Sequence, residues 1–515
     1  MDMMLITMMH STVIYDGTNQ PYVFLLNGNG DIDTDQGKVT VNIPNSVNTV
    51  ALQVRVRNDG ETGFSGFDNF RLSSEFDGLI YADDGTFAGW EPSAPNNTTG
   101  TQNAYVYSGT YNVGTNIQIN DFFIRNGATA TVSAGQSIKT NSGILNNGTL
   151  ELNSVSTSFS SLITDRINGE VIYNRHVNQR NGTGSTTGNN DLISAPVTNA
   201  SQTFLALRTA NSDIPSGNIG GVPSYLFGPF DNVANAYINY NATHDASVIA
   251  SGIGYRTAST QPTGSTFKFV GDVEIGTKTV PITVGAGSKS NLIGNPYPSY
   301  IKLSTFLTAN NTQFSPTSSG VYGYRGNMTS GFIIWNQAYS DANPSAKIAP
   351  GQGFFVNSKT GGGTINFTPD MRIIGTTDDF ISGRSTNQNL AHLNLQVTNE
   401  DQQYQTDLYF NNNASLSMDP GYDSEMFEAN TPEFAIYSQL VEDNIGNDLA
   451  AQSVRYSDLE NVTIPIGINI TQGEQATISI SENNIPEGTT VILEDNVTNT
   501  FTNLLEGDYT FTSAT

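Results

Sequence analysis

Cysteine is missing from all 515 residues of the sequence. Disulfide bonds, thiolate metal sites and thiol redox chemistry are therefore excluded. At this length three or four domains are expected, because one hydrophobic core seldom supports so long a chain. Without cross-links, we expect these domains to be stabilised by packing, with bound ions as the only further aid.

Positive charge is also scarce. Lysine and arginine number 21 against 47 aspartates and glutamates, which gives a net charge of −26 and a pI near 4.3. Such a chain repels nucleic acid and anionic lipid, so neither is an expected partner. The remaining polarity lies in Asn, Thr, Ser and Gly, a composition that we interpret as extracellular.

Long apolar runs are absent too. No stretch approaches the roughly 18 residues that cross a bilayer, so we expect no membrane insertion. The opening, "MDMMLITMMHSTVIYDG", carries no lysine or arginine and lacks the basic start of a secretory signal. We interpret it as the interior of a domain, and the chain as a fragment.

Catalytic signatures are few. The four histidines follow no zinc-binding spacing, no G-x-S-x-G elbow occurs, and "GAGSKS" lacks the spacing of a phosphate loop. Paired carboxylates for glycoside hydrolysis stay open, because such pairs meet only in the fold. The acids gather in turns such as "YADDG" and "TTDDF", however, where they hydrogen-bond their own backbone. The sequence therefore predicts a protein that is not an enzyme.

Helical periodicity is almost absent, whereas apolar and polar residues alternate with a period of two in many segments. Val50, Leu52, Val54 and Val56 give a clear example within residues 1–75. This pattern predicts half-buried antiparallel strands and an all-β fold. Residues 1–75 hold too few strands for a complete sandwich, so we expect a truncated domain there.

A different pattern marks residues 76–165. Gly109, Gly127 and Gly148 lie 18 and 21 residues apart, each at a polar turn after an apolar-rich strand. Repeats of about 20 residues are typical of a solenoid whose rungs share one core. The sequence therefore predicts a short β-solenoid in this range.

The rest of the chain divides in two. Residues 166–382 carry short apolar segments between long Gly, Ser and Asn loops, which predicts a β-sandwich with long loops. Alternation returns in residues 383–515, with the strand spacing of an immunoglobulin-like β-sandwich that stops in mid-strand. The expected fold is thus all-β, with tandem β-sandwich domains and a short β-solenoid segment.

One acidic hairpin is a candidate metal site. In "NGNGDIDTDQGKV", Asp31, Asp33 and Asp35 alternate and could direct carboxylate oxygens towards one Ca²⁺. The segment fails as an EF-hand, because glycine stands at the seventh position and Asn42 at the twelfth. A plain acidic turn is the simpler interpretation, and calcium, the only cofactor considered, is the alternative.

The two tryptophans are candidate ligand-binding residues. Trp90 in "FAGWEPSAP" and Trp335 in "GFIIWNQAYS" could stack on sugars, since a flat apolar face with a polar edge suits carbohydrate. The other interpretation makes each an anchor in a core or loop. We favour anchoring, because each has apolar or proline neighbours to pack on.

The stretch "NLIGNPYPSYI" predicts a rigid turn. Pro296 and Pro298 fix their own φ and restrict the preceding residues to extended geometry, while Gly294 permits a close approach. One of the two X-Pro bonds could be cis. A catalytic turn would need an acid, base or nucleophile, and only Ser299 and the tyrosines are present. We therefore predict a structural clamp, formed by Gly294, Pro296, Tyr297 and Pro298, that ties a long loop to the sheet.

Three segments carry a family resemblance: "LIGNPYP" (Leu292 to Pro298), "PGQGFFV" (Pro350 to Val356) and "FTPDMR" (Phe367 to Arg372). Together they resemble the repeated β-sandwich region of large surface and secreted proteins that Bacteroidetes export through the type IX secretion system. "NDLISAPV" and the glycine-spaced segment before it are similar to that family's entry strand and β-solenoid. "FDNFRL" is similar to the last strand of a jelly roll, and residues 383–515 to an immunoglobulin-like module.

The resemblance implies that residues 1–75 are the C-terminal part of a jelly-roll β-sandwich. It also implies an extracellular or cell-surface location. The family's export signal and C-terminal sorting domain are not in this sequence, so secretion is implied by kinship alone.

We therefore expect a non-catalytic surface protein that acts in adhesion or as a structural scaffold or fibre component. Its partners would be surface glycans, proteins or copies of itself. The alternative is a glycan-binding accessory region of a secreted polysaccharide-degrading enzyme. Clustering of Trp90, Trp335 and tyrosines on one exposed face would favour glycan binding, whereas strand edges that meet neighbouring chains would favour a fibre.

Overall fold

The structure is a computed structural model, in which the chain divides into two compact units, Met1–Phe76 and Asp77–Thr515. It describes the backbone of four strands in the first unit and most of the second unit with its side chains. The described residues are 2–8, 12–15, 21–24, 50–56, 78–83, 88–179, 190–324, 332–378, 390–427 and 431–513.

The described residues of the first unit form two strand pairs. β1 (Asp2–Met8) pairs in parallel with β4 (Val50–Val56), and β2 (Thr12–Tyr15) forms an antiparallel hairpin with β3 (Pro21–Phe24). The alternating residues of β4 are those that the sequence assigned to a strand. The jelly-roll origin of this unit stays a prediction.

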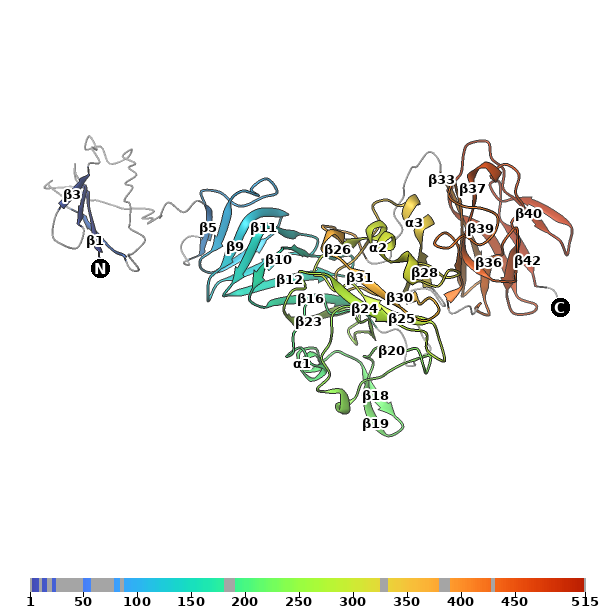
Figure 1. Cartoon of the computed structure of the whole chain (residues 1–515), viewed down its shortest axis with the longest axis horizontal. Coiled ribbons are helices and arrows are strands. Elements are labelled where there is room, and N and C mark those ends of the chain that lie inside the picture. The colour runs from blue at the N-terminus through green and yellow to red at the C-terminus, as the bar shows by residue number, and fades with distance from the viewer. Residues whose placement is uncertain are drawn as a thin grey trace. The chain divides into compact units, whose positions relative to one another are not determined.

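The second unit begins with a β-solenoid of parallel strands (Figure 1). One sheet runs in the order β14-β11-β9-β7-β5-β6, and a second continues as β16-β12-β10-β8. The pairing advances by 18 residues between β7 and β9 (Ala104 to Phe122) and by 20 between β10 and β12 (Thr129 to Thr149). The strands are β5 (Gly78–Asp83), β6 (Ala88–Glu91), β7 (Asn103–Val106), β8 (Thr110–Val113), β9 (Ile117–Ile124), β10 (Thr129–Val132), β11 (Ser137–Asn146), β12 (Thr149–Val155), β13 (Ser158–Phe159), β14 (Ser161–Ile163), β15 (Ile167–Asn168) and β16 (Val171–Val177).

The alternation of apolar and polar residues accounts for the strands of each solenoid rung, and the spacing of glycines accounts for the turns. The inward residues of each strand, such as Ile119 and Leu152, are fully buried between the two sheets. Gly109, Gly127 and Gly169 adopt φ of +73°, +82° and +101° at the turns between strands, a conformation that favours glycine. The solenoid features predicted from the sequence are thus present, and the parallel ladder continues past residue 165, where the sequence placed the boundary.

The solenoid shares a sheet and a core with the region that follows. β16 pairs antiparallel with β23 (Ser265–Gly271) along its whole length, from Val171 opposite Gly271 to Val177 opposite Ser265. One hydrophobic core contains solenoid residues such as Phe122 together with Phe227 and Phe269 of the next region. No break in the core therefore separates the solenoid from the middle region, residues 190–378.

The middle region packs small sheets and short helices on a second core. A four-stranded sheet has the order β25-β30-β27-β28, and a three-stranded sheet the order β29-β26-β32. The elements are β17 (Asp191–Ile193), α1 (Phe204–Ala210), β18 (Ser216–Ile219), β19 (Val222–Tyr225), β20 (Phe230–Asp231), β21 (Ala236–Tyr237), β22 (Tyr255–Thr257), β24 (Lys278–Ile282), β25 (Ser290–Gly294), β26 (Tyr300–Lys302), α2 (Leu303–Asn310), β27 (Val321–Tyr324), β28 (Phe332–Trp335), α3 (Gln337–Ala342), β29 (Lys347–Ile348), β30 (Gly353–Asn357), β31 (Gly363–Phe367) and β32 (Arg372–Ile373).

The three short α-helices were not expected from the sequence. α2 buries Leu303, Phe306, Leu307 and Asn310, which is the one-sided spacing of an amphipathic helix. Each helix has only two turns or fewer, so this spacing does not stand out against the alternation of the surrounding strands.

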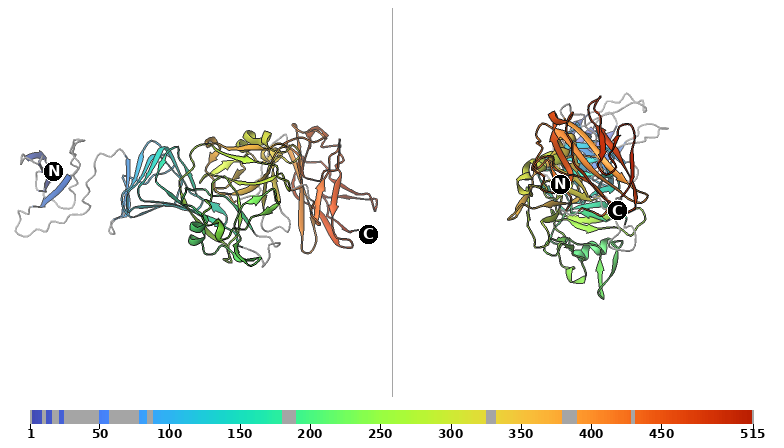
Figure 2. Two further views of the ribbon diagram at one scale, coloured as in Figure 1. Left: turned by 60° about the horizontal axis from the view of Figure 1, so that its bottom comes forward. Right: turned by 90° about the vertical axis from the view of Figure 1, so that its right-hand side faces the viewer.

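The C-terminal region, residues 390–513, contains a large sheet in the order β38-β36-β37-β34-β33-β39-β42 around a third core, and a separate two-stranded sheet of β40 and β41 (Figure 2). Its outer face supplies Leu390, Tyr409 and Ala451 to the core of the middle region. The all-β class is confirmed, with β-sandwich and β-solenoid features. The strands are β33 (Leu390–Thr398), β34 (Gln403–Asn411), β35 (Ser424–Glu425), β36 (Ala435–Ser438), β37 (Leu449–Arg455), β38 (Ile466–Asn469), β39 (Gln475–Asn484), β40 (Ile492–Asp495), β41 (Thr500–Asn503) and β42 (Tyr509–Thr512).

The solenoid turns allow a matched glycine test. A Cβ on Gly169 would lie 2.0 Å from the backbone oxygen of Asn146, whereas a Cβ on Gly127 would meet nothing within 4 Å. Both glycines have positive φ, so each alanine costs about 1 kcal/mol in backbone strain. We expect Gly169→Ala to lower the free energy of unfolding by roughly 2 kcal/mol more than Gly127→Ala, because of the added clash. Urea unfolding of the two variants checks this, and equal midpoints would contradict the rung geometry.

Candidate functional site

The segment after β25 forms a buried knot centred on Asn295. Every residue from Leu292 to Tyr300 is buried. The Asn295 Nδ2 donates to the backbone oxygens of Ser299, over 2.8 Å, and Ala349, over 2.9 Å, while its Oδ1 accepts from the Tyr297 N–H over 3.0 Å. Both X-Pro bonds of the knot are trans. The amide of Asn295 thus satisfies three backbone groups that would otherwise be unpaired away from water.

Tyr297 fixes the knot to the rest of the middle region. Its hydroxyl lies 2.7 Å from the backbone oxygen of Gly276 and 2.8 Å from that of Phe367. Burial is the main cause that raises the pKa of the Tyr297 phenol, while the nearby Arg372 lowers it. The phenol therefore stays neutral and serves as a hydrogen-bond donor.

Close backbone approaches bring the motifs of the sequence together. A Cβ on Gly294 would lie 2.4 Å from the Cβ of Ser194, in "ISAPV". The Ser194 N–H donates to the backbone oxygen of Gly351, in "PGQGFFV", over 2.7 Å, and Gly351 has φ of +59°. Glycine is needed at both positions, at Gly294 for space and at Gly351 for its conformation.

The same knot holds the last rung of the solenoid. The Leu162 N–H donates to the backbone oxygen of Pro298 over 2.7 Å, and the Phe159 N–H to the Tyr300 hydroxyl over 3.2 Å. Arg372, from "FTPDMR", donates to the backbone oxygen of Thr164 over 2.7 Å. Gly294, Pro296, Tyr297 and Pro298, with Asn295 at the centre, therefore lie at the junction of solenoid and middle region; we call this segment the clamp.

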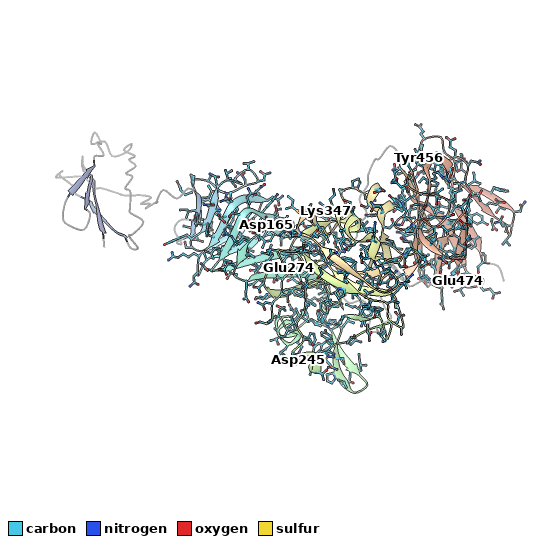
Figure 3. The ribbon with its side chains drawn as sticks, viewed as in Figure 1. Asp165, Asp245, Glu274, Lys347, Tyr456 and Glu474 are labelled. Atoms are coloured by element: carbon cyan, nitrogen blue, oxygen red, sulfur yellow. The ribbon has the colours of Figure 1, made fainter. Side chains whose placement is uncertain are left out.

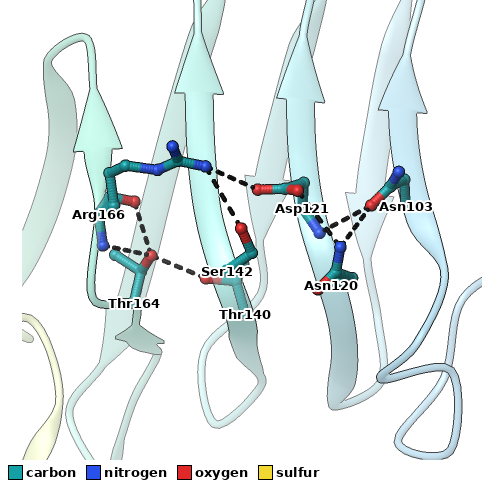
Figure 4. A network of polar contacts seen from close by, with 7 residues as sticks. All are labelled: Asn103, Asn120, Asp121, Thr140, Ser142, Thr164 and Arg166. Atoms are coloured by element: carbon teal, nitrogen blue, oxygen red, sulfur yellow. Dashed lines mark hydrogen bonds and ion pairs between the residues drawn. The ribbon is translucent and has the colours of Figure 1, made fainter.

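A polar ladder, partly buried and partly exposed, links neighbouring strands of the solenoid (Figure 4). Arg166 donates to the Asp121 carboxylate over 3.2 Å and to the Ser142 hydroxyl over 3.3 Å, and Thr140 donates to Thr164 over 2.7 Å. The Arg166 side chain is largely exposed, so its ion pair contributes little to stability. The ladder links neighbouring rungs and brings no nucleophile beside a base.

The two tryptophans do not form a common platform. Trp335 is only 2% exposed and stacks on Tyr339, with ring centroids 5.0 Å apart, so it has no face for a sugar. Trp90 is half-buried and packs edge-on against Tyr111 at 4.7 Å. They belong to different cores. Ligand binding at Trp335 is therefore wrong, because its apolar neighbours enclose it.

An aromatic surface that the sequence did not indicate lies where the middle region meets the C-terminal region. Five half-buried rings pack in one cluster with the buried Phe355, and we call them the aromatic patch. Two of them, Phe332 and Phe427, stack with centroids 3.9 Å apart. The rings come from distant segments, so no local motif reveals them. The aromatic patch consists of Phe230, Tyr237, Tyr324, Phe332 and Phe427.

One histidine meets a carboxylate on the C-terminal sheet. His392 Nε2 lies 2.8 Å from Asp407 Oδ1, and Asn394 Nδ2 donates to the same oxygen over 2.8 Å. The Ser481 hydroxyl donates to Asn394 rather than to His392. A serine triad requires a hydrogen bond between nucleophile and histidine, which this group of described residues does not contain. The arrangement is a hydrogen-bond network across three strands.

Metal binding has little support in the part of the chain that the structure describes. There, no group of three or more His, Cys, Asp or Glu side chains is placed to hold an ion. Asp31, Asp33 and Asp35 lie outside the described residues. Calcium at these aspartates stays a prediction.

Asp423 is a buried carboxyl group between the middle region and the C-terminal sheet. Burial raises its pKa to about 7, against the opposing effect of hydrogen bonds from the N–H groups of Asp419 and Ser453. Those bonds measure 2.6 and 2.7 Å. Next to it, the Asn336 amide donates to the backbone oxygen of Tyr422 over 2.8 Å. Asp423 therefore changes charge near neutral pH within a domain junction.

These features define a class: a multidomain all-β protein in which a solenoid continues into the next sheet. Among the described residues, no helix is both long and apolar enough to cross a membrane. Residues 88–515 match the model of the family described as "Domain of unknown function (DUF8693)", and the chain belongs to that family. No curated protein and no solved structure matches the chain.

The clamp is tested by removing its hydrogen bonds. Tyr297→Phe takes the donor from the buried carbonyl of Phe367 and the half-buried carbonyl of Gly276, and should lower the free energy of unfolding by about 1 to 2 kcal/mol. Asn295→Ala leaves three backbone groups unpaired and should cost roughly 3 kcal/mol or more. Tyr107→Phe, at an exposed ring, is the control and should change stability by less than about 0.5 kcal/mol. Similar urea midpoints for all three variants would rule out the clamp as a stabilising element.

The raised pKa of Asp423 predicts a pH dependence. The folded protein holds this proton more tightly than the unfolded chain does. The contribution of the bound proton to the free energy of unfolding is therefore complete below about pH 4 and is lost as the pH rises to about 7. The loss has a slope of up to about 1.4 kcal/mol per pH unit. Asp423→Asn removes this titration, so the stability of wild type relative to the variant should fall over that window and level off above it.

Thermal unfolding at half-unit steps from pH 4 to pH 8 measures that difference. Asp401→Asn, at an exposed site, is the control and should run parallel to wild type throughout. Parallel curves for Asp423→Asn as well would show that this carboxyl titrates normally.

Proposed function

We propose that the chain is a non-catalytic surface protein that acts in adhesion or as a structural scaffold, exported as the type IX resemblance implies. The observation that carries this is the continuity of the second unit. The solenoid, middle region and C-terminal sheet share strands or cores, and the clamp seals the first junction. Such continuity suits a protein whose task is to hold binding loops in place.

Composition supports the same role. A chain without cysteine keeps its long loops in place by buried amide and phenol hydrogen bonds, as at Asn295 and Tyr297. The β18–β19 hairpin projects from the middle region, with Ile219 55% exposed and Val222 47% exposed at its tip (Figure 1). Exposed apolar side chains on a rigid support are typical of elements that contact partners.

A second candidate is the glycan-binding accessory region, and the aromatic patch favours it. Half-buried rings offer flat apolar faces at the surface, as sugar platforms do. Arg256 lies over the Tyr237 ring at 4.2 Å and donates to Asn239, which places polar groups beside the rings. The aromatic patch takes the place of Trp90 and Trp335 as the candidate carbohydrate surface.

Gene deletion in the organism that encodes the chain separates the two candidates. For a surface scaffold, protease added to intact cells should digest the protein, and deletion should reduce attachment several-fold without changing growth on polysaccharides. Wild type should restore attachment, as should Tyr107→Phe, whereas Asn295→Ala should restore it only in part because the clamp is lost.

The opposite result identifies the second candidate. If deletion changes growth on a polysaccharide and leaves attachment intact, the scaffold proposal fails. In that case Phe332→Ala should weaken retention of the purified chain in gels that contain the polysaccharide, relative to Tyr107→Phe.

A further inference from the structure

The core of the C-terminal sheet is unevenly covered. It holds 15 buried hydrophobic residues and 16 that are only partly buried, whereas the core of the middle region holds 24 buried and 3 partly buried. The buried residues of this third core, such as Leu393 and Ile478, belong mainly to central strands. The partly buried ones include Ile466 and Ile468 on β38 and Tyr509 and Phe511 on β42. The core is therefore least covered at the two edge strands.

These edges carry backbone that the sheet does not pair. In the part of the chain that the structure describes, β38 pairs with β36 alone and β42 with β39 alone. β42 covers only Gln475–Ile478 of the ten-residue β39. Ile480, beyond that overlap, is among the partly buried residues. A strand added beside β42 would extend the sheet and cover the partly buried Tyr509 and Phe511 of β42.

Charge identifies what such a strand must carry. Residues 390–515 contain 20 of the 47 acidic residues of the chain and one of its 21 lysines and arginines, Arg455. That arginine is already paired with Asp458, at 3.3 Å. A second copy of this chain, with a net charge of −26, would be repelled by the region.

Acidic groups stand at both ends of β42. The exposed Glu506 and Asp508 precede Tyr509, and Glu474 lies at the other end, just before β39, where its backbone oxygen accepts from the Ser513 N–H over 2.9 Å. Glu474 Oε2 is buried and has no hydrogen-bond partner among the described residues. A buried carboxylate oxygen without a partner is costly, and a lysine or arginine would satisfy it. Figure 3 labels Glu474 on the C-terminal region.

We propose that the C-terminal sheet binds an extended segment of another polypeptide as a strand beside β42. The segment has apolar side chains at every second position, which complete the cover of Tyr509 and Phe511. It has lysine or arginine at its ends, one of which pairs with Glu474. The site holds whether the chain is an adhesin or a glycan-binding region, because it depends on the sheet edge alone.

Three labelled peptides test the site by fluorescence anisotropy with the full chain. KTVTVTVTK has the proposed pattern, ETVTVTVTE reverses the end charges, and KTTVVVTTK keeps the composition but not the alternation. We expect the first peptide to bind about tenfold or more tightly than either control, with an affinity that falls as salt rises. Equal binding of the three peptides would overturn the proposal.

Two variants locate the binding. Glu474→Gln should weaken KTVTVTVTK several-fold and leave the neutral peptide TTVTVTVTT unchanged. Phe511→Lys places a charge in the apolar edge and should abolish binding, whereas Ile445→Lys, at a 77% exposed site, should not. If Phe511→Lys does not fold, the effect of Glu474→Gln on the affinity for KTVTVTVTK still tests the proposal. Unchanged affinity in Glu474→Gln, or self-association of the chain in light scattering without peptide binding, would contradict the proposal.

Discussion

The side-chain amide of Asn295 is the interaction on which the junction of the second unit depends. A knot with two prolines removes backbone donors and forces extended geometry, so its remaining polar groups cannot pair within a regular sheet. Asn295 pairs two of them, the Ser299 oxygen and the Tyr297 N–H, and it also donates to the backbone oxygen of Ala349. This fixes Tyr297 and Pro298 where they reach the middle region and the solenoid. In a chain without cysteine, a buried amide thus holds together segments in the way that a disulfide does in other proteins.

The sequence predicted what depends on local periodicity. Alternation marked strands such as β4, and the spacing of Gly109 and Gly127 marked the solenoid, because strand faces and tight turns each constrain residue type directly. Pairing between strands that are far apart in the sequence produces no such local pattern. The continuation of β16 into β23 joins residues about one hundred positions apart, and the sequence instead suggested a domain boundary near residue 165.

The candidate sites likewise divide into those that the local sequence predicts and those that depend on contacts across the fold. Proline and glycine identified the clamp, since their backbone limits are intrinsic, but the aromatic patch depends on Phe332 and Phe427 meeting across the fold. The raised pKa of Asp423 likewise follows from burial, which residue type does not reveal. For Trp335, in contrast, the local sequence was sufficient. Its apolar neighbours favoured an anchoring role over a ligand site, and the structure places it in a core.

Hydrogen exchange of the native protein, followed by mass spectrometry, tests the central claim most directly. If the clamp makes solenoid and middle region one cooperative unit, peptides that contain Phe159 and Leu162 should exchange as slowly as peptides from the solenoid core around Ile119. All of them should lose protection together as urea is added. Fast exchange at Phe159 and Leu162, with separate loss of protection in solenoid and middle region, would contradict the account.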